Sequence, residues 1–174
     1  LLMDPDVTAV SMMGVAGTGK TFLALAAALE QTIEAGRYRR ISVYRPLVAV
    51  GRQEVGFLPG DLDEKLAPWM AAVHDNLYAL FSGDPQSAKG AIEEVMERNV
   101  IEMAAVTYLR GRSITDELVI IDDARSGSHQ IGDDYLSDFT DEELAKLGSY
   151  VTEGGKIILA GCEFGKDPSG EAAV

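Results

Sequence analysis

The sequence is poor in the residues that build disulfide frameworks and structural zinc sites. Its 174 residues include one cysteine, Cys162, and two histidines, His74 and His129. A single cysteine cannot form a disulfide within the chain, and these three residues do not have the spacing of zinc ligands. The composition therefore fits a reducing, cytoplasmic location.

Long apolar runs and an excess of positive charge are also missing. The longest apolar stretch, around residues 22–29, is far shorter than the roughly 20 residues that a membrane-spanning helix needs. The chain carries 28 acidic and 15 basic residues, which gives a formal net charge of −13. Such a charge repels anionic membranes and nucleic acids. We therefore expect no membrane partner, and any contact with RNA or DNA has to use a local basic patch.

What is present is enough for one domain. A chain of 174 residues, 47% of them hydrophobic, can bury the core of one ordinary α/β domain but not of two. We therefore expect a single domain over residues 1–174. The chain opens with Leu1 rather than an initiator methionine, which suggests a piece of a longer protein. A missing targeting sequence consequently says nothing about secretion.

Apolar and β-branched runs alternate with helical patterns along the chain. Strands are predicted at residues 7–13, 41–44, 100–104, 118–121 and 156–160. Helices are predicted at residues 20–35, 61–81 and 88–98, and after a capping box at residues 140–143. This alternation predicts an α/β fold in which helices cover both faces of a mostly parallel five-stranded sheet, a three-layer α/β/α sandwich.

The long second helix carries two further expectations. Pro68 lies well inside it and predicts a kink or an early break, because proline has no N–H for the helical hydrogen bond. Trp69, Tyr78 and Phe81 recur at roughly helical spacing, so all three are predicted to face the core.

A glycine-rich stretch, GVAGTGKT, lies at residues 14–21 between the first strand and the first helix. Glycines let the backbone curl so that several N–H groups point into one concavity, and the helix dipole adds positive potential there. The alternative is a glycine-rich turn that only joins strand to helix, but the full motif in this context favours nucleotide binding. The predicted nucleotide-binding residues are Gly14, Val15, Ala16, Gly17, Thr18, Gly19, Lys20, Thr21 and Phe22.

Two side chains of this loop have separate predicted roles. Lys20 is expected to reach the β- and γ-phosphate oxygens of the nucleotide, and so to act in catalysis. The hydroxyl of Thr21 is expected to ligate Mg²⁺.

An aspartate pair follows the fourth predicted strand. Asp122 has the position of the carboxylate that holds Mg²⁺ through water, although an aspartate pair at a strand end is also common turn chemistry. Asp123 stands where a hydrolase usually has the glutamate that orients the attacking water. Aspartate is one methylene shorter, and a misplacement of about 1 Å can cost on the order of a hundredfold in rate. Slow hydrolysis is therefore expected.

Three linking segments, RPLVAVG, GFLPGDLDEKLAPW and YLRGRS, then make the chain resemble the PhoH-like family of P-loop ATPases over about residues 3–123. The likeness is to the ATPase half of members that also carry an N-terminal PIN nuclease domain. It implies a RecA-like core that binds ATP with Mg²⁺, and a homo-oligomeric ring, hexameric in the relatives, that couples turnover to unwinding and cleavage of RNA. It also implies that the loop residues bind the phosphates, that Asp122 holds the metal, and that Asp123 takes the place of the catalytic glutamate.

The chain departs from the family pattern at three places. The family's Asp-Glu-Ala-Gln is Asp-Asp-Ala-Arg at residues 122–125, and its Gly-Asp before a phosphate-sensing glutamine is replaced by Gly-Cys-Glu at residues 161–163. Residues 126–153 are longer and more acidic than the corresponding helix of the family. Carboxylates on that face would repel a nucleic-acid backbone.

Arginines form two candidate sites. The run Arg-Tyr-Arg-Arg at residues 37–40 could contact a phosphate backbone or a stacked base, or it is a solvated helix end. Arg110 and Arg112 flank a glycine, and an arginine donated across a ring interface can stabilise the transition state; an ordinary pair of surface arginines is the alternative.

The leading hypothesis is a Mg²⁺-dependent ATPase that acts with single-stranded RNA. A second is a nucleotide-responsive switch that binds ATP with little hydrolysis, supported by Asp123, Arg125 and Cys162. A third, a small-molecule kinase with the same loop, is disfavoured by the family segments between residues 45 and 69.

Overall fold

The computed structural model describes residues 1–14, 17–45, 62–81, 85–105, 108, 114–124, 129–131, 134–136 and 154–161. Its helices are α1 (Lys20–Leu29), continued by a π-helical turn η1 (Glu30–Glu34), α2 (Leu62–Leu80) and α3 (Pro85–Glu97). Its strands are β1 (Ala9–Met13), β2 (Arg40–Arg45), β3 (Ile101–Ala105), β4 (Glu117–Ala124), β5 (His129–Ile131), β6 (Asp134–Leu136) and β7 (Lys156–Gly161).

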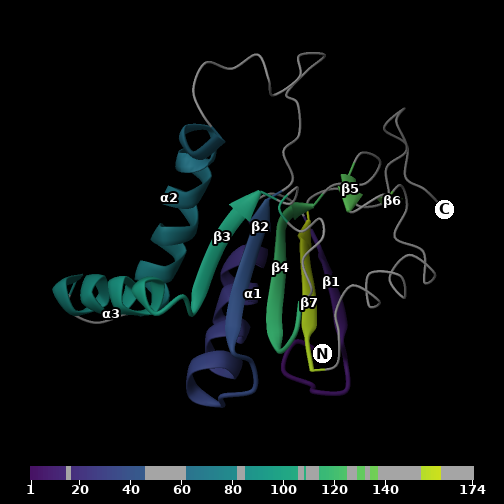
Figure 1. The fold of residues 1–174 in the computed structure, drawn as a ribbon, viewed down its shortest axis with the longest axis horizontal. Coiled ribbons are helices and arrows are strands. Elements are labelled where there is room, and N and C mark those ends of the chain that lie inside the picture. The colour runs from purple at the N-terminus through teal and green to yellow at the C-terminus, as the bar shows by residue number, and fades with distance from the viewer. Residues whose placement is uncertain are drawn as a thin grey trace.

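Five of these strands form one parallel sheet in the order β1-β7-β4-β2-β3 (Figure 1). This confirms the predicted α/β fold with a parallel five-stranded sheet. The last of the described strands, β7, lies between β1 and β4 and pairs with both. A short antiparallel pair, β5 and β6, was not predicted, because its two three-residue strands lie in a stretch that the sequence marks only by its acidic side chains.

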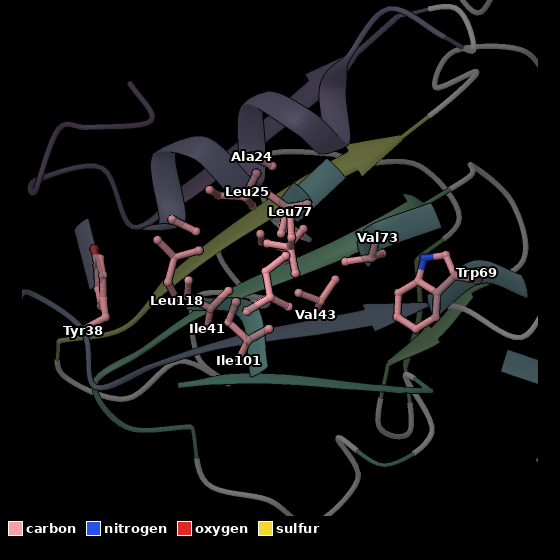
Figure 2. Packing of buried hydrophobic residues seen from close by; sticks show 14 of the residues in the cluster. Ala24, Leu25, Tyr38, Ile41, Val43, Trp69, Val73, Leu77, Ile101 and Leu118 are labelled. Carbon is pink, nitrogen blue, oxygen red and sulfur yellow. The ribbon is translucent and has the colours of Figure 1, made fainter. Parts of the chain in front are cut away.

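The core lies between the sheet and the three described helices. Alternate strand residues such as Ile41, Val43 and Leu118 meet apolar side chains of the helices in one cluster (Figure 2). Helix α1 contributes Ala24, Leu25 and Ala28, helix α2 contributes Leu66, Trp69, Val73 and Leu77, and helix α3 contributes Ile92. The described helices therefore cover the same face of the sheet. The helix predicted after residues 140–143 lies outside the described residues.

Helix α2 differs from its prediction at two residues. It runs through Pro68 as one helix, so the early break was wrong. Buried residues on both sides of Pro68, Leu66 and Trp69, pack into the core and offset the missing hydrogen bond. Trp69 is buried and Phe81 is partly buried, but Tyr78 is 40% exposed, so its prediction as core was wrong.

Two charged side chains are buried at the end of the sheet where the parallel strands begin. Lys156 donates hydrogen bonds to the carbonyl oxygens of Leu1 (3.1 Å) and Asp4 (2.8 Å) and so ties β7 to the N-terminal segment. Glu117 accepts hydrogen bonds from Arg39, Arg40 and Ser42. Because each charge has close partners, the sheet can hold both in its interior.

Within the ranges given above, no helix has both the length and the apolar character needed to cross a membrane.

Candidate nucleotide-binding site

The predicted site residues that the structure describes gather where the parallel strands end. Strand β1 leads into the glycine loop, and Asp122 lies near the end of β4, with β7 between the two strands. In open parallel sheets, ligands bind in the crevice outside the carboxyl ends of the strands. The topology therefore brings together two motifs that are about 100 residues apart in the sequence.

Two glycines of the loop adopt a backbone conformation that suits glycine. Gly17 and Gly19 have φ angles of 80° and 81°, a left-handed conformation that side chains disfavour. Gly19 is the N-cap of α1 and makes no side-chain cap, and the first turn of the helix holds no acidic residue. The helix thus begins with backbone N–H groups and positive potential that suit an anion.

Lys20 is the first residue of α1, and its side chain turns back across the loop. Its Nζ donates hydrogen bonds to the carbonyl oxygen of Gly14 (2.8 Å) and to Oγ1 of Thr18 (3.3 Å). The ammonium group therefore lies inside the curl of the loop, beside the helix N-terminus. This places its charge where a phosphate chain bound to the loop would need it.

Thr21 and Asp122 form the contact that joins the two motifs. The Thr21 hydroxyl donates to Oδ1 of Asp122 at 2.6 Å, and Asp122 is only 7% exposed. A hydroxyl that donates its proton keeps two lone pairs on oxygen. Hard cations such as Mg²⁺ prefer oxygen ligands of this kind, supplemented by water and phosphate oxygens. The pair therefore fits a Mg²⁺ ion held with a nucleotide.

The second oxygen of Asp122 has a partner that the sequence did not reveal. The indole N–H of Trp69 donates to Oδ2 at 2.9 Å, in a contact that is buried. The guanidinium carbon of Arg45, the last residue of β2, lies 5.9 Å from the centroid of the Trp69 ring. Trp69 was predicted only as a core residue, because its partner is 53 residues away and no local pattern connects them.

Asp123 lies where the regular pairing of β4 is interrupted. Asp122 pairs with Ala160 and Ala124 pairs with Gly161, so the register shifts across Asp123. Such irregularities bend a strand and re-aim its side chains, and they are frequent beside active sites. The regular alternation of side chains along β4 is therefore interrupted directly after Asp122. The side chain of Asp123 is not among those that the structure describes.

Several predicted residues lie outside the described ranges. These are Val15, Ala16, Arg110, Arg112, Arg125, Cys162 and Glu163. Phe22 is described and is half-buried in α1.

The arginine run at residues 37–40 lies at the other end of the strands, where β2 and β4 begin. Arg37 donates to a carbonyl oxygen of the N-terminal segment, and Arg39 donates to Glu117 at 3.2 Å. Arg40 pairs with Glu117 and, at 3.0 Å, with Glu102. Tyr38, between them, is buried, and burial raises the pKa of its phenol. The run is therefore not the solvated helix end of the second interpretation, because Arg40 begins β2 and Tyr38 is buried. Arg39 and Arg40 contact carboxylates that would compete with a nucleic-acid backbone.

Comparison with known proteins gives consistent matches. A family model described as "PhoH-like protein" matches residues 2–133. The protein PhoH2 of Thermobispora bispora is 48% identical over 126 residues, which cover 72% of this chain and 28% of the relative. PhoH2 of Bacillus subtilis is 42% identical over 161 residues, covering 92% of this chain and 33% of the relative. A PhoH-like protein of Bacillus subtilis is 40% identical over 114 residues, which cover 66% of this chain and 33% of the relative. The chain thus spans about a third of the length of these relatives.

Proposed function

The chain belongs to the PhoH-like family of nucleotide-binding P-loop proteins. On that basis we propose that it binds ATP with Mg²⁺, hydrolyses it slowly, and couples the hydrolysis to the unwinding or processing of RNA. The observation that carries the proposal is the hydrogen bond between Thr21 and Asp122, beside a helix that begins at Lys20. It joins a phosphate-binding loop to a buried carboxylate, which is the pairing that ATP hydrolysis by P-loop proteins requires.

In the proposed reaction, each residue of the site has one task. The loop N–H groups and Lys20 bind the phosphates and lower the repulsion that an attacking oxygen meets. Thr21 and Asp122 would hold Mg²⁺, which neutralises charge on the phosphate oxygens. Asp123 would orient the attacking water, with a shorter reach than glutamate. Hydrolysis is therefore proposed to be slow.

The RNA part of the proposal rests on the family resemblance. It includes a homo-oligomeric ring, hexameric as in the relatives the resemblance points to, single-stranded RNA as the substrate of the motor, and a PIN nuclease domain in the full-length protein. Arg110 or Arg112 would reach a neighbouring subunit's nucleotide in such a ring.

A second candidate function is a switch that binds ATP and barely turns it over. Asp123, in place of the longer glutamate, favours it. Such a protein would change conformation or assembly with its bound nucleotide, and hydrolysis would be too slow to drive a motor.

The test is phosphate release from ATP with Mg²⁺, with and without single-stranded RNA, together with a separate measurement of ATP binding by calorimetry. The chain is compared with Lys20→Ala, Asp123→Glu and, as a matched lysine control, Lys89→Ala. Lys89 is 62% exposed on α3, where it pairs only with Glu93 in the contacts described.

Hydrolysis that Lys20→Ala abolishes and Lys89→Ala leaves intact would support the ATPase, and stimulation by RNA would support the motor. If the unaltered chain binds ATP but only Asp123→Glu hydrolyses it, the switch replaces the motor. Failure of the unaltered chain to bind ATP at all would overturn both.

A further inference from the structure

Trp69 holds one oxygen of the carboxylate whose other oxygen contacts Thr21. Its Nε1 donates to Oδ2 of Asp122 at 2.9 Å, while Thr21 donates to Oδ1 at 2.6 Å. Two donors from different helices thus fix the orientation of a single carboxylate. The torsion that turns an aspartate carboxylate is broad, so its orientation is set by such partners rather than by the side chain itself.

The indole is itself held firmly. Trp69 is 6% exposed and belongs to the core cluster that α2 forms with the sheet. Arg45 lies over its ring, at 5.9 Å from the centroid, within the range of a cation–π contact. A buried indole N–H needs an acceptor, and here the acceptor is the carboxylate of the predicted metal site rather than a backbone carbonyl.

We propose that Trp69 is a positioning residue that orients Asp122 for metal binding. The inference rests on the proposed function, because it assigns Asp122 to Mg²⁺. Without the indole N–H, Oδ2 loses its donor in a buried site and the carboxylate turns to satisfy it. Oδ1 then moves away from Thr21, and the paired oxygen ligands of the metal come apart.

The proposal also makes the sole tryptophan of the chain a reporter on the metal site. Its N–H contacts a charged carboxylate, so its fluorescence depends on the charge of Asp122. Binding of Mg²⁺ with ATP changes that charge environment and is expected to change the emission.

The first experiment measures the Mg²⁺ concentration needed for tight ATP binding, using calorimetry at a series of Mg²⁺ concentrations and in EDTA. Trp69→Phe keeps an aromatic ring and removes the N–H. We expect the Mg²⁺ requirement to rise by about tenfold to a hundredfold, the usual loss when a partner of a metal ligand is removed. ATP affinity in EDTA is expected to stay unchanged, because the phosphate loop is intact.

Val73→Ala is the matched control, because Val73 is buried in the same cluster one turn along α2. It loosens the packing of α2 but does not remove a donor from Asp122. An equal rise in the Mg²⁺ requirement in Val73→Ala would show that Trp69 acts only through packing, and would overturn the proposal.

The second experiment uses ligand-free protein and needs no turnover. Asp122→Asn removes the charge beside the indole, and we expect a shift of tryptophan emission. Asp116→Asn is the control: Asp116 lies directly before the start of β4, far along the strand from Asp122, so the emission is expected to stay unchanged. Unchanged emission in Asp122→Asn would overturn the contact. An unchanged Mg²⁺ requirement in Trp69→Phe, in a chain that binds ATP, would overturn the positioning role alone. Failure of the unaltered chain to bind ATP would instead overturn the proposed function, and the metal role with it.

Discussion

Gly19 holds a backbone conformation, φ of 81°, that is costly for any residue with a β-carbon. We predict that Gly19→Ala lowers the free energy of unfolding by about 1–2 kcal/mol, because alanine pays the left-handed penalty. It should also weaken ATP binding, since the N-cap of α1 shifts to relieve the strain. Urea unfolding and calorimetry with ATP would measure the two effects.

Gly90 supplies the matched control. It lies inside α3, and a β-carbon there would meet no atom within 4 Å. Gly90→Ala should therefore raise the free energy of unfolding by about 0.5–1 kcal/mol through helix propensity. Equal effects of the two substitutions would contradict the strain at Gly19.

Lys156 makes the free energy of unfolding depend on pH. Burial lowers the pKa of its ammonium from the ordinary 10.5, and this outweighs the opposing effect of Asp4. Between the lowered pKa and 10.5, the unfolded chain binds more protons than the folded one, so the contribution of Lys156 to stability rises with pH across that window. Below the window the contribution is constant and unfavourable.

Lys156→Met removes this titration. We expect the unaltered chain to gain stability relative to Lys156→Met as the pH rises toward 10.5. Urea unfolding of both proteins at several pH values would measure the difference. A difference that stays the same at every pH would show that the pKa of Lys156 is not lowered by folding.

At the scale of the elements, Glu117 connects the starts of β2 and β4. It is 3% exposed and accepts hydrogen bonds from Arg39, Arg40 and Ser42. Glu117→Ala leaves the Arg40 guanidinium without this partner in a half-buried site. Arg40 keeps Glu102 as a partner, and the buried Ser42 hydroxyl loses its acceptor. We predict a loss of about 1–3 kcal/mol in the free energy of unfolding, measured with urea.

Glu93→Ala is the control for the loss of a carboxylate. Glu93 pairs with Lys89 on the surface of α3, and both side chains are 62% exposed. Its removal should change stability by less than about 0.5 kcal/mol. If Glu117→Ala proved equally mild, the cluster at the start of the strands would not hold the sheet together.

The sequence predicted these elements well and their long-range polar contacts poorly. The sheet strands and the first three helices were found because their apolar patterns are local. Tyr78 shows the limit of spacing: it is nine residues from Trp69, about two and a half helical turns, and so faces the other way. The partners of Trp69 and Glu117 lie 53 and 75–78 residues away. No local pattern reveals such contacts.

The candidate site divides in the same way. The glycine loop and the position of Asp122 follow from short motifs. A phosphate-binding loop is specified by the spacing of its glycines and lysine, and the end of a strand is specified by the few residues that follow its apolar run. The bond of Asp122 to Trp69 and the register shift at Asp123 depend on how β4 meets α2 and β7. These are properties of the assembled sheet.

At the scale of the whole molecule, a net charge of −13 means that the proposed binding of RNA has to depend on a few local cations. Because Arg39 contacts Glu117, Arg39→Ala should leave RNA affinity unchanged. Affinity should also fall steeply between about 50 and 200 mM salt. Fluorescence anisotropy with labelled single-stranded RNA would measure both effects. A loss of affinity in Arg39→Ala would place the RNA at the edge where the strands begin.

The position of β7 affects the order in which the strands of the sheet can pair during synthesis. Among the described strands, β1 pairs only with β7, which lies near the other end of the sequence. Closing so long a loop is slow, because entropy is lost before the contact is gained. During synthesis, β1 therefore has no strand to pair with in the sheet until β7, which ends at Gly161, has left the ribosome. The strand that carries the phosphate loop is translated first among the five and joins the sheet only when the last of them arrives.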